Sequence, residues 1–189
     1  GWVLIASFST TKEIFANKLL SSGFHFENYE KAWVNSDVST IFFNSLFYSL
    51  LSVCLLILVC APAAYALSRF EFFGNKLMQH SFVASMGVPV VMIVLPLFAL
   101  VAGLDILNNV TANKFTLIFL YVGINVPYTT IFLMGFFANI SRAFEEAAAI
   151  DGCPPGKTFW LIMLPMAQPG IITVSIFNFI NVWNEYFIS

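Results

Sequence analysis

Four long apolar runs constrain the fold of this chain more than any other feature of its sequence. They cover residues 38–68, 81–104, 115–140 and 161–187, and Glu185 is the one charged residue inside them. A helix needs roughly 20 predominantly apolar residues to cross the hydrocarbon core of a bilayer, and each run reaches that length. Because a backbone in lipid must satisfy its own hydrogen bonds, we predict an all-α, polytopic transmembrane helical bundle.

The overall composition agrees with a membrane environment. Hydrophobic residues make up 59% of the chain and charged residues 10%, whereas roughly a quarter of a soluble domain is charged. The formal net charge is −2 and the few basic residues form no stripe. We therefore expect membrane lipid, and no nucleic acid, among the partners.

The segments between the runs are shorter and more polar. Residues 9–37 mix charged and aromatic side chains, which suits a loop with a surface helix lying on the membrane face. Residues 105–114 read as a short polar connection. Inside the second run, Pro89 and Pro96 are expected to interrupt the helix, because proline cannot donate a backbone hydrogen bond.

One stretch, residues 141–169, is rich in local helix signals. Ser141 is a good N-cap, and Ala147, Ala148 and Ala149 are the strongest helix formers. Gly152 is suited to the left-handed position after a helix, and Pro155 to the first turn of a new one. The sequence therefore predicts a short helix from residue 141 to 151, a sharp turn and a second helix.

Seven residues in this stretch stand at a characteristic spacing from one another. In order they are Glu146, Ala147, Ala148, Gly152, Ile162, Leu164 and Pro165. Their spacing resembles the cytoplasmic loop signature of the membrane permease subunits of ATP-binding-cassette importers. The local residues by themselves favour the plainer interpretation of a capped surface helix followed by a buried one.

The resemblance implies that residues 141–160 form a cytoplasmic coupling loop whose short helix docks on an ATPase subunit. The residues to which it assigns this contact are Glu145, Glu146, Ala147, Ala148, Asp151 and Gly152. The segments at residues 64–70 (AYALSRF) and 183–187 (WNEYF) resemble the carbohydrate-importing branch. Cys153 departs from the family pattern, where a small Ala is usual.

The resemblance also sets the expected assembly. It implies a second permease subunit in a heterodimer, two ATPase subunits and an extracytoplasmic solute-binding protein, in the cytoplasmic membrane of a prokaryote. We expect residues 1–189 to be a single transmembrane permease domain and a fragment of a longer chain. Its first span would be mostly missing, since the apolar residues 1–8 are too few to cross, and its last span absent.

Polar residues inside the apolar runs are candidates for a solute pathway. At about 100° per residue, Asn178, Asn181 and Glu185 fall on one side of a helix. Amides and a carboxylate can bond sugar hydroxyls, but they can equally bond neighbouring helices. The candidate pathway residues are Tyr121, Asn125, Asn178, Asn181, Trp183 and Glu185.

No catalytic constellation accompanies these residues. The stretch between Gly152 and Gly156 resembles a phosphate-binding loop, but it is one residue too short and two of its residues are prolines. No His-Glu pair at metal spacing and no Gly-x-Ser-x-Gly turn occurs, so we expect no enzyme activity, metal or cofactor. The predicted function is a permease subunit of a sugar or oligosaccharide importer, with a permease for another solute, or a membrane scaffold or enzyme, as alternatives.

Overall fold

The computed structural model describes residues 1–35, 37–103 and 110–185. The chain forms two compact units, Gly1–Leu46 and Phe47–Ser189. The described residues of both units are helices joined by turns and loops, as predicted from the apolar runs.

The first unit contains three short helices, α1 (Trp2–Ser7), α2 (Thr11–Phe15) and α3 (Glu27–Asn35). Glu13 organises it. Thr10 caps α2 through a reciprocal capping box with Glu13, whose carboxylate also accepts hydrogen bonds from the hydroxyl groups of Ser21 and Ser22 at 2.6 and 2.8 Å. The sequence predicted a loop with a surface helix over residues 9–37, and the structure places α2 and α3 there, with the loop between them hydrogen-bonded to the Glu13 carboxylate.

Among the residues that the structure describes, two helices are individually long and apolar enough to cross a membrane. These are α4 (Val38–Arg69) and α7 (Val110–Asn139). They confirm the predicted runs at 38–68 and 115–140. The expected connection at 105–114 is wrong for its second half, because residues 110–114 form the first turns of α7; residues 104–109 lie outside the described part of the chain.

The other two runs are each a bent pair of helices. Helices α5 (Asn75–Ser85) and α6 (Val90–Gly103) meet at 93°, and the break ends at Pro89. The prediction of an interruption is confirmed at Pro89 and wrong at Pro96, which lies inside α6. By length and composition, the described helices could supply two membrane spans, or four if each bent pair is one span.

The last pair bends at a position that the sequence prediction missed. Helix α9 (Pro155–Thr158) continues through a π-helical turn (Phe159–Met163) into α10 (Leu164–Met166), and α11 (Gln168–Trp183) departs at 71°. In a continuous helix the residue at 169 would donate to the carbonyl of Pro165. Because Pro169 has no N–H group and its ring would collide with that carbonyl, the helix breaks there.

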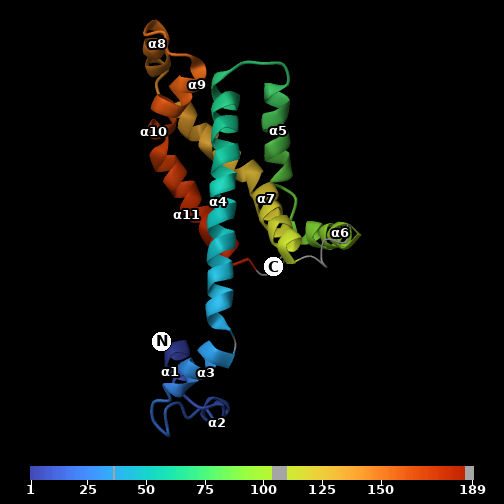
Figure 1. The fold of residues 1–189 in the computed structure, drawn as a ribbon, viewed down its shortest axis with the longest axis vertical. Coiled ribbons are helices and arrows are strands. Elements are labelled where there is room, and N and C mark those ends of the chain that lie inside the picture. The colour runs from blue at the N-terminus through green and yellow to red at the C-terminus, as the bar shows by residue number, and fades with distance from the viewer. Residues whose placement is uncertain (36, 104–109, 186–189) are drawn as a thin grey trace. The chain divides into compact units, whose positions relative to one another are not determined.

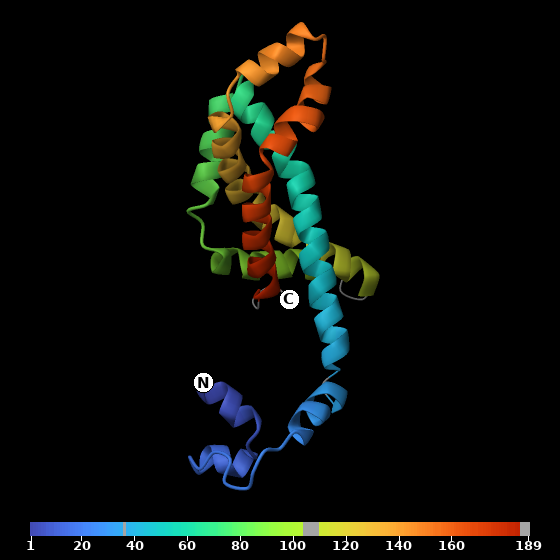
Figure 2. The same ribbon diagram turned by 90° about the vertical axis from the view of Figure 1, so that its left-hand side faces the viewer.

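Within the second unit, α7 packs against both α5 and α11. The buried core gathers residues of α4, α7, the π-helical turn, the bend between α10 and α11, and α11 itself: Leu56, Cys60, Ala61, Ala64, Tyr65, Leu133, Phe137, Phe159, Met163, Ala167 and Val174. Gly170 allows the close approach of α11 to α7, since a Cβ there would lie 2.4 Å from the ring of Phe136. Figures 1 and 2 show helix α8 (Ala143–Ile150) at the end of this unit where α4 ends and α5 begins.

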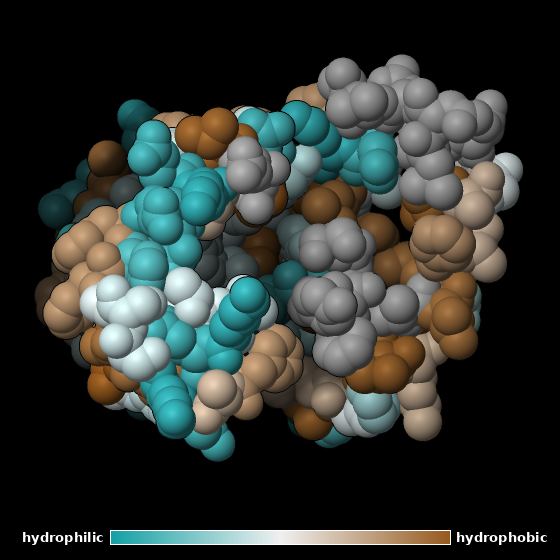
Figure 3. Space-filling view, turned by 90° about the horizontal axis from the view of Figure 1, so that it is seen from below, coloured by the Kyte–Doolittle hydropathy of each residue, from teal (hydrophilic) through white to brown (hydrophobic). Residues whose placement is uncertain are grey.

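Many large apolar side chains face outward. On the second unit they include Leu58 and Val59 of α4, Leu95 of α6, Phe119 of α7 and Ile176 of α11. The face drawn in Figure 3 likewise carries hydrophobic residues beside hydrophilic ones. Exposed apolar surface on this scale is typical of proteins that contact lipid or other subunits.

Candidate functional site

The candidate site is the segment around α8, where the predicted helix and turn are both present. The helix is shorter than predicted, because Ser141 does not occupy the N-cap position. Its hydroxyl accepts a hydrogen bond from the Ala143 N–H at 3.3 Å, which places Arg142 at the N-cap. The helix therefore begins at Ala143 and ends at Ile150.

The turn after α8 is held by a Schellman motif. The N–H of Cys153 donates to the carbonyl of Ala148 at 2.8 Å, and the N–H of Gly152 donates to the carbonyl of Ala149 at 3.0 Å. Gly152 has a φ of +73°, so its predicted left-handed conformation is confirmed. This turn fixes the direction in which the chain leaves α8 for Pro155.

One side of α8 is open to solvent. Ile150 is 87% exposed, and Phe144, Glu146 and Ala147 are exposed with it, while Ala148 is the buried residue of the helix. Residues three and four apart are neighbours on a helix surface. The open side therefore presents an apolar patch beside a carboxylate, which is suited to contact with another protein.

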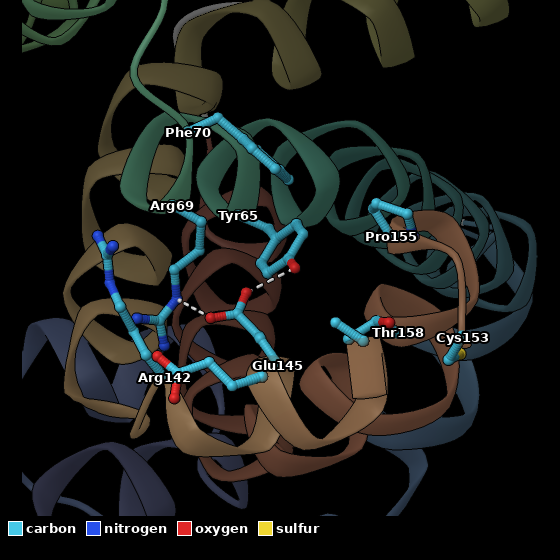
Figure 4. A pocket seen from close by; sticks show the side chains of 10 residues that line it. Tyr65, Arg69, Phe70, Arg142, Glu145, Cys153, Pro155 and Thr158 are labelled. Atoms are coloured by element: carbon cyan, nitrogen blue, oxygen red, sulfur yellow. Dashed lines mark hydrogen bonds and ion pairs between the residues drawn. The ribbon is translucent and has the colours of Figure 1, made fainter. Parts of the chain in front are cut away.

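The other side of α8 is tied to α4 through Glu145. The Tyr65 hydroxyl donates to one carboxylate oxygen at 2.6 Å, and the Nε of Arg69 lies 3.3 Å from the other (Figure 4). Arg69 also donates through Nη2 to the carbonyl of Ile140. Sequence reasoning assigned Glu145 to the partner contact and missed Tyr65 and Arg69 as its partners, although both lie in the noted segment at 64–70.

A cavity of about 350 Å³ lies between these elements. Figure 4 shows the charged side chains of Arg69, Arg142 and Glu145 on one side of it, with Cys153 and Pro155 on the other. Its remaining lining comes from Tyr65, Phe70, Glu146, Ala149 and Thr158. Both signs of charge meet here, so the cavity is suited to a polar or charged side chain rather than to a simple anion.

The predicted polar strip on the last helix is wrong as a continuous strip. Asn178 is fully buried and donates to the Thr129 hydroxyl at 3.0 Å and to the Val174 carbonyl at 2.8 Å. Asn181 is exposed. Glu185 follows the end of α11 at Trp183, so it does not continue the face that carries Asn178.

Of the other pathway candidates, Tyr121 and Asn125 lie on α7 and Trp183 ends α11. Tyr121 is buried in α7, and Asn125 donates to its carbonyl at 2.8 Å, so this amide is bound within its own helix. Trp183 stacks on Phe179 with ring centroids 5.7 Å apart. Among the described residues, no group of three or more His, Cys, Asp and Glu side chains is placed to hold a metal ion.

The sequence of this chain is similar to those of known proteins. Residues 42–189 match the model of the "Binding-protein-dependent transport system inner membrane component" family. The diacetylchitobiose uptake system permease protein NgcG of Streptomyces coelicolor is 37% identical, with 98% of this chain and 60% of that protein covered. The sulfoquinovosyl glycerol transport system permease protein SmoH of Agrobacterium fabrum is 32% identical, covering 100% and 65%.

A solved structure shares the fold. A chain of a bacterial ABC transporter involved in the import of the acidic polysaccharide alginate superposes with a TM-score of 0.80 at 24% identity, over 98% of this chain and 64% of that one. In sequence and in structure, the present chain thus spans between 60% and 65% of the length of these three proteins.

Proposed function

The chain belongs to the family of inner membrane components of binding-protein-dependent transport systems, and on this basis we propose that it is part of a permease subunit of an ATP-driven importer. The observation that carries the proposal is the geometry of residues 141–160. A short helix with an open apolar face is set by a left-handed glycine turn at one end of a bundle of long apolar helices. Such a helix provides a compact docking surface for another subunit.

The proposed assembly follows from the family. It contains a second permease subunit, two ATP-binding-cassette ATPases that hydrolyse ATP, and an extracytoplasmic solute-binding protein, in the cytoplasmic membrane of a prokaryote. The open face of α8 is the proposed ATPase contact. It presents Glu146 and Ala147 directly, with Asp151 and Gly152 at its C-terminal end.

The proposed mechanism uses α8 as a mechanical link. Closure of the ATPase dimer on ATP displaces the docked helix, and the permease helices exchange between inward-facing and outward-facing arrangements. This is a population shift. ATP can change the equilibrium between the two arrangements only by the difference in the free energy with which the closed ATPase dimer binds each of them. The permease itself needs no catalytic residue for this step.

The proposed solute is a sugar or oligosaccharide. The relatives described above are named for a chitobiose derivative, a sulfoquinovosyl glycerol and alginate, all of which are carbohydrates. We assign Asn178 to helix packing because it is buried and bonded to α7. Tyr121, Asn125, Asn181, Trp183 and Glu185 remain the proposed pathway residues.

The test is reconstitution of the full-length permease with its partner subunits in liposomes. We expect both ATPases to copurify with the permease, and ATP hydrolysis to rise when the binding protein is added with its carbohydrate. Parallel assays with amino acids and peptides test the alternative of another solute. A permease that copurifies with no ATPase would overturn the proposal.

A further inference from the structure

We propose that Tyr65, Arg69 and Glu145 form a latch that fixes α8 to the end of α4, so that these two helices move as one body. The role of this latch in transport rests on the proposed function, because a rigid connection between α8 and α4 transmits force only if an ATPase moves α8. The proposal gives different roles to two neighbouring carboxylates. Glu145 positions the helix from inside, and Glu146 is left for the partner.

The latch joins α4 to the segment that contains Ile140 and Glu145, 71 to 80 residues further along the chain. One oxygen of Glu145 accepts a hydrogen bond from the Tyr65 hydroxyl at 2.6 Å, and the other forms an ion pair with the Nε of Arg69 at 3.3 Å, without hydrogen-bond geometry. Arg69 extends the connection to the backbone of Ile140, directly after α7. The start of α8 is therefore bound to the ends of both long helices.

The side chains of Arg69 and Glu145 are largely buried, so water cannot readily take the place of their contacts. The side chain of Arg69 is 6% exposed and that of Glu145 is 20% exposed. A charge removed from water to this degree needs a partner of opposite charge, and removal of one member leaves the other uncompensated. Glu145 is thus engaged inside the permease, whereas Glu146 is exposed and its carboxylate makes no hydrogen bond or ion pair within the described part of the chain.

Helix α8 needs such a fixture because little else holds it. A helix of eight residues is too short to be stable alone in water, and Ala148 is its one buried residue. Tyr65, by contrast, is firmly placed. Its ring packs against those of Phe137 and Phe159 with centroids 5.5 and 5.1 Å away.

The first measurement needs no ATPase. Cys153 lines the same cavity as the latch, so the rate at which a maleimide modifies its thiol reports how firmly α8 is held. Cys54 and Cys60 are first replaced by Ala in the full-length permease. We expect Tyr65→Phe and Glu145→Gln to raise the rate at Cys153 several-fold, and Glu71→Gln, a matched control at an exposed Glu outside this cavity, to leave it unchanged.

The second measurement uses the assembled transporter. Tyr65→Phe and Glu145→Gln should keep the ATPases attached within about twofold, while stimulation of ATP hydrolysis by the binding protein falls close to the basal rate. Their double variant should be no worse than the poorer single variant, since both act on one contact. Glu146→Gln should instead weaken ATPase attachment.

Two results would overturn the latch. One is a labelling rate at Cys153 that stays unchanged in both Tyr65→Phe and Glu145→Gln. The other is release of the ATPases by Glu145→Gln to the same extent as by Glu146→Gln. Neither is the result that would overturn the proposed function, which is the failure of the unmodified permease to bind any ATPase. Tyr65→Phe keeps the test decisive where Glu145→Gln lowers abundance, because it removes a single hydroxyl group.

Discussion

The backbone at Gly152 takes a φ of +73°, and no atom lies within 4 Å of the position where a Cβ would stand. A substitution there is therefore strained by the backbone conformation and not by crowding. We expect Gly152→Val to cost about 1–2 kcal/mol locally, which is too little to unfold the bundle but enough to misplace α8. The permease should insert at near-normal abundance while ATPase attachment or transport falls.

The matched control is Gly152→Asn, because Asn adopts the left-handed conformation more readily than other residues with a side chain. It should retain most of the ATPase that Gly152→Val loses, as measured by copurification. If Gly152→Val transports at the unmodified rate with the ATPases fully attached, the assignment of this turn to coupling is wrong.

Glu13 gives a residue-scale prediction for the first unit. Hydrogen bonds from Ser21, from the backbone of Thr10 and from Ser22 hold the pKa of its carboxyl far below the usual range. A group with a lowered folded-state pKa stabilises the fold above its unfolded pKa of about 4.3, and this contribution is lost as the pH falls below that value. The first unit should therefore be more stable in the wild type than in Glu13→Gln, and this difference should be largest at neutral pH.

Limited proteolysis within residues 9–37 can measure this difference across pH. Wild type should resist cleavage better than Glu13→Gln at pH 7, and the two should converge as the pH falls below 4. A difference that grows as the pH is lowered would contradict the hydrogen-bonded carboxylate.

At the scale of elements, one amide links two long helices. Asn178 of α11 donates to Thr129 of α7 in the buried interior, and such contacts between helices in membranes contribute roughly 0.6–2 kcal/mol. We expect Asn178→Leu to lower the amount of folded permease, because it leaves Thr129 without this bond. Asn181→Leu, on the exposed side of the same helix, should leave abundance unchanged and impair uptake.

Detergent-extracted abundance and uptake, measured on both variants, separate the two positions. Loss of the assembled transporter in Asn181→Leu would assign Asn181 to packing as well. Normal abundance of Asn178→Leu would show that the buried bond does not stabilise the contact of α7 with α11.

At the scale of the whole molecule, the bent pairs decide the topology. If α5 with α6 crosses the membrane as one broken span, single Cys residues at Lys76 and Asn113 should react from opposite sides. Lys157→Cys should then react from the same side as Lys76→Cys. All three are placed in a background without Cys54, Cys60 and Cys153, and labelled with a membrane-impermeant maleimide.

The labelling of Lys76→Cys and Asn113→Cys from one side would instead make α5 with α6 a re-entrant pair. Lys157 would then lie on the opposite side, and the four-span prediction would fail. The two uninterrupted helices α4 and α7 would remain the crossing elements.

Local chemistry was enough to predict much of this protein. Runs of apolar residues fix where membrane helices can form, and α4 and α7 follow them closely. The turn at Gly152 and the helix start at Pro155 were also predictable, because each depends on a property of the residue itself. Proline was a less reliable signal, since Pro62, Pro96 and Pro127 stay inside helices while the chain bends beside Pro89 and Pro169.

Only the tertiary structure decided which polar side chains meet. Glu145 finds Tyr65 across 80 residues of sequence, and Asn178 finds Thr129 across 49. Neither partner is implied by spacing along the chain, because the contact depends on how tilted and bent helices approach one another. The sequence by itself thus determined the membrane helices and the glycine turn, while packing between distant helices determined that Glu145 faces inward and Glu146 outward.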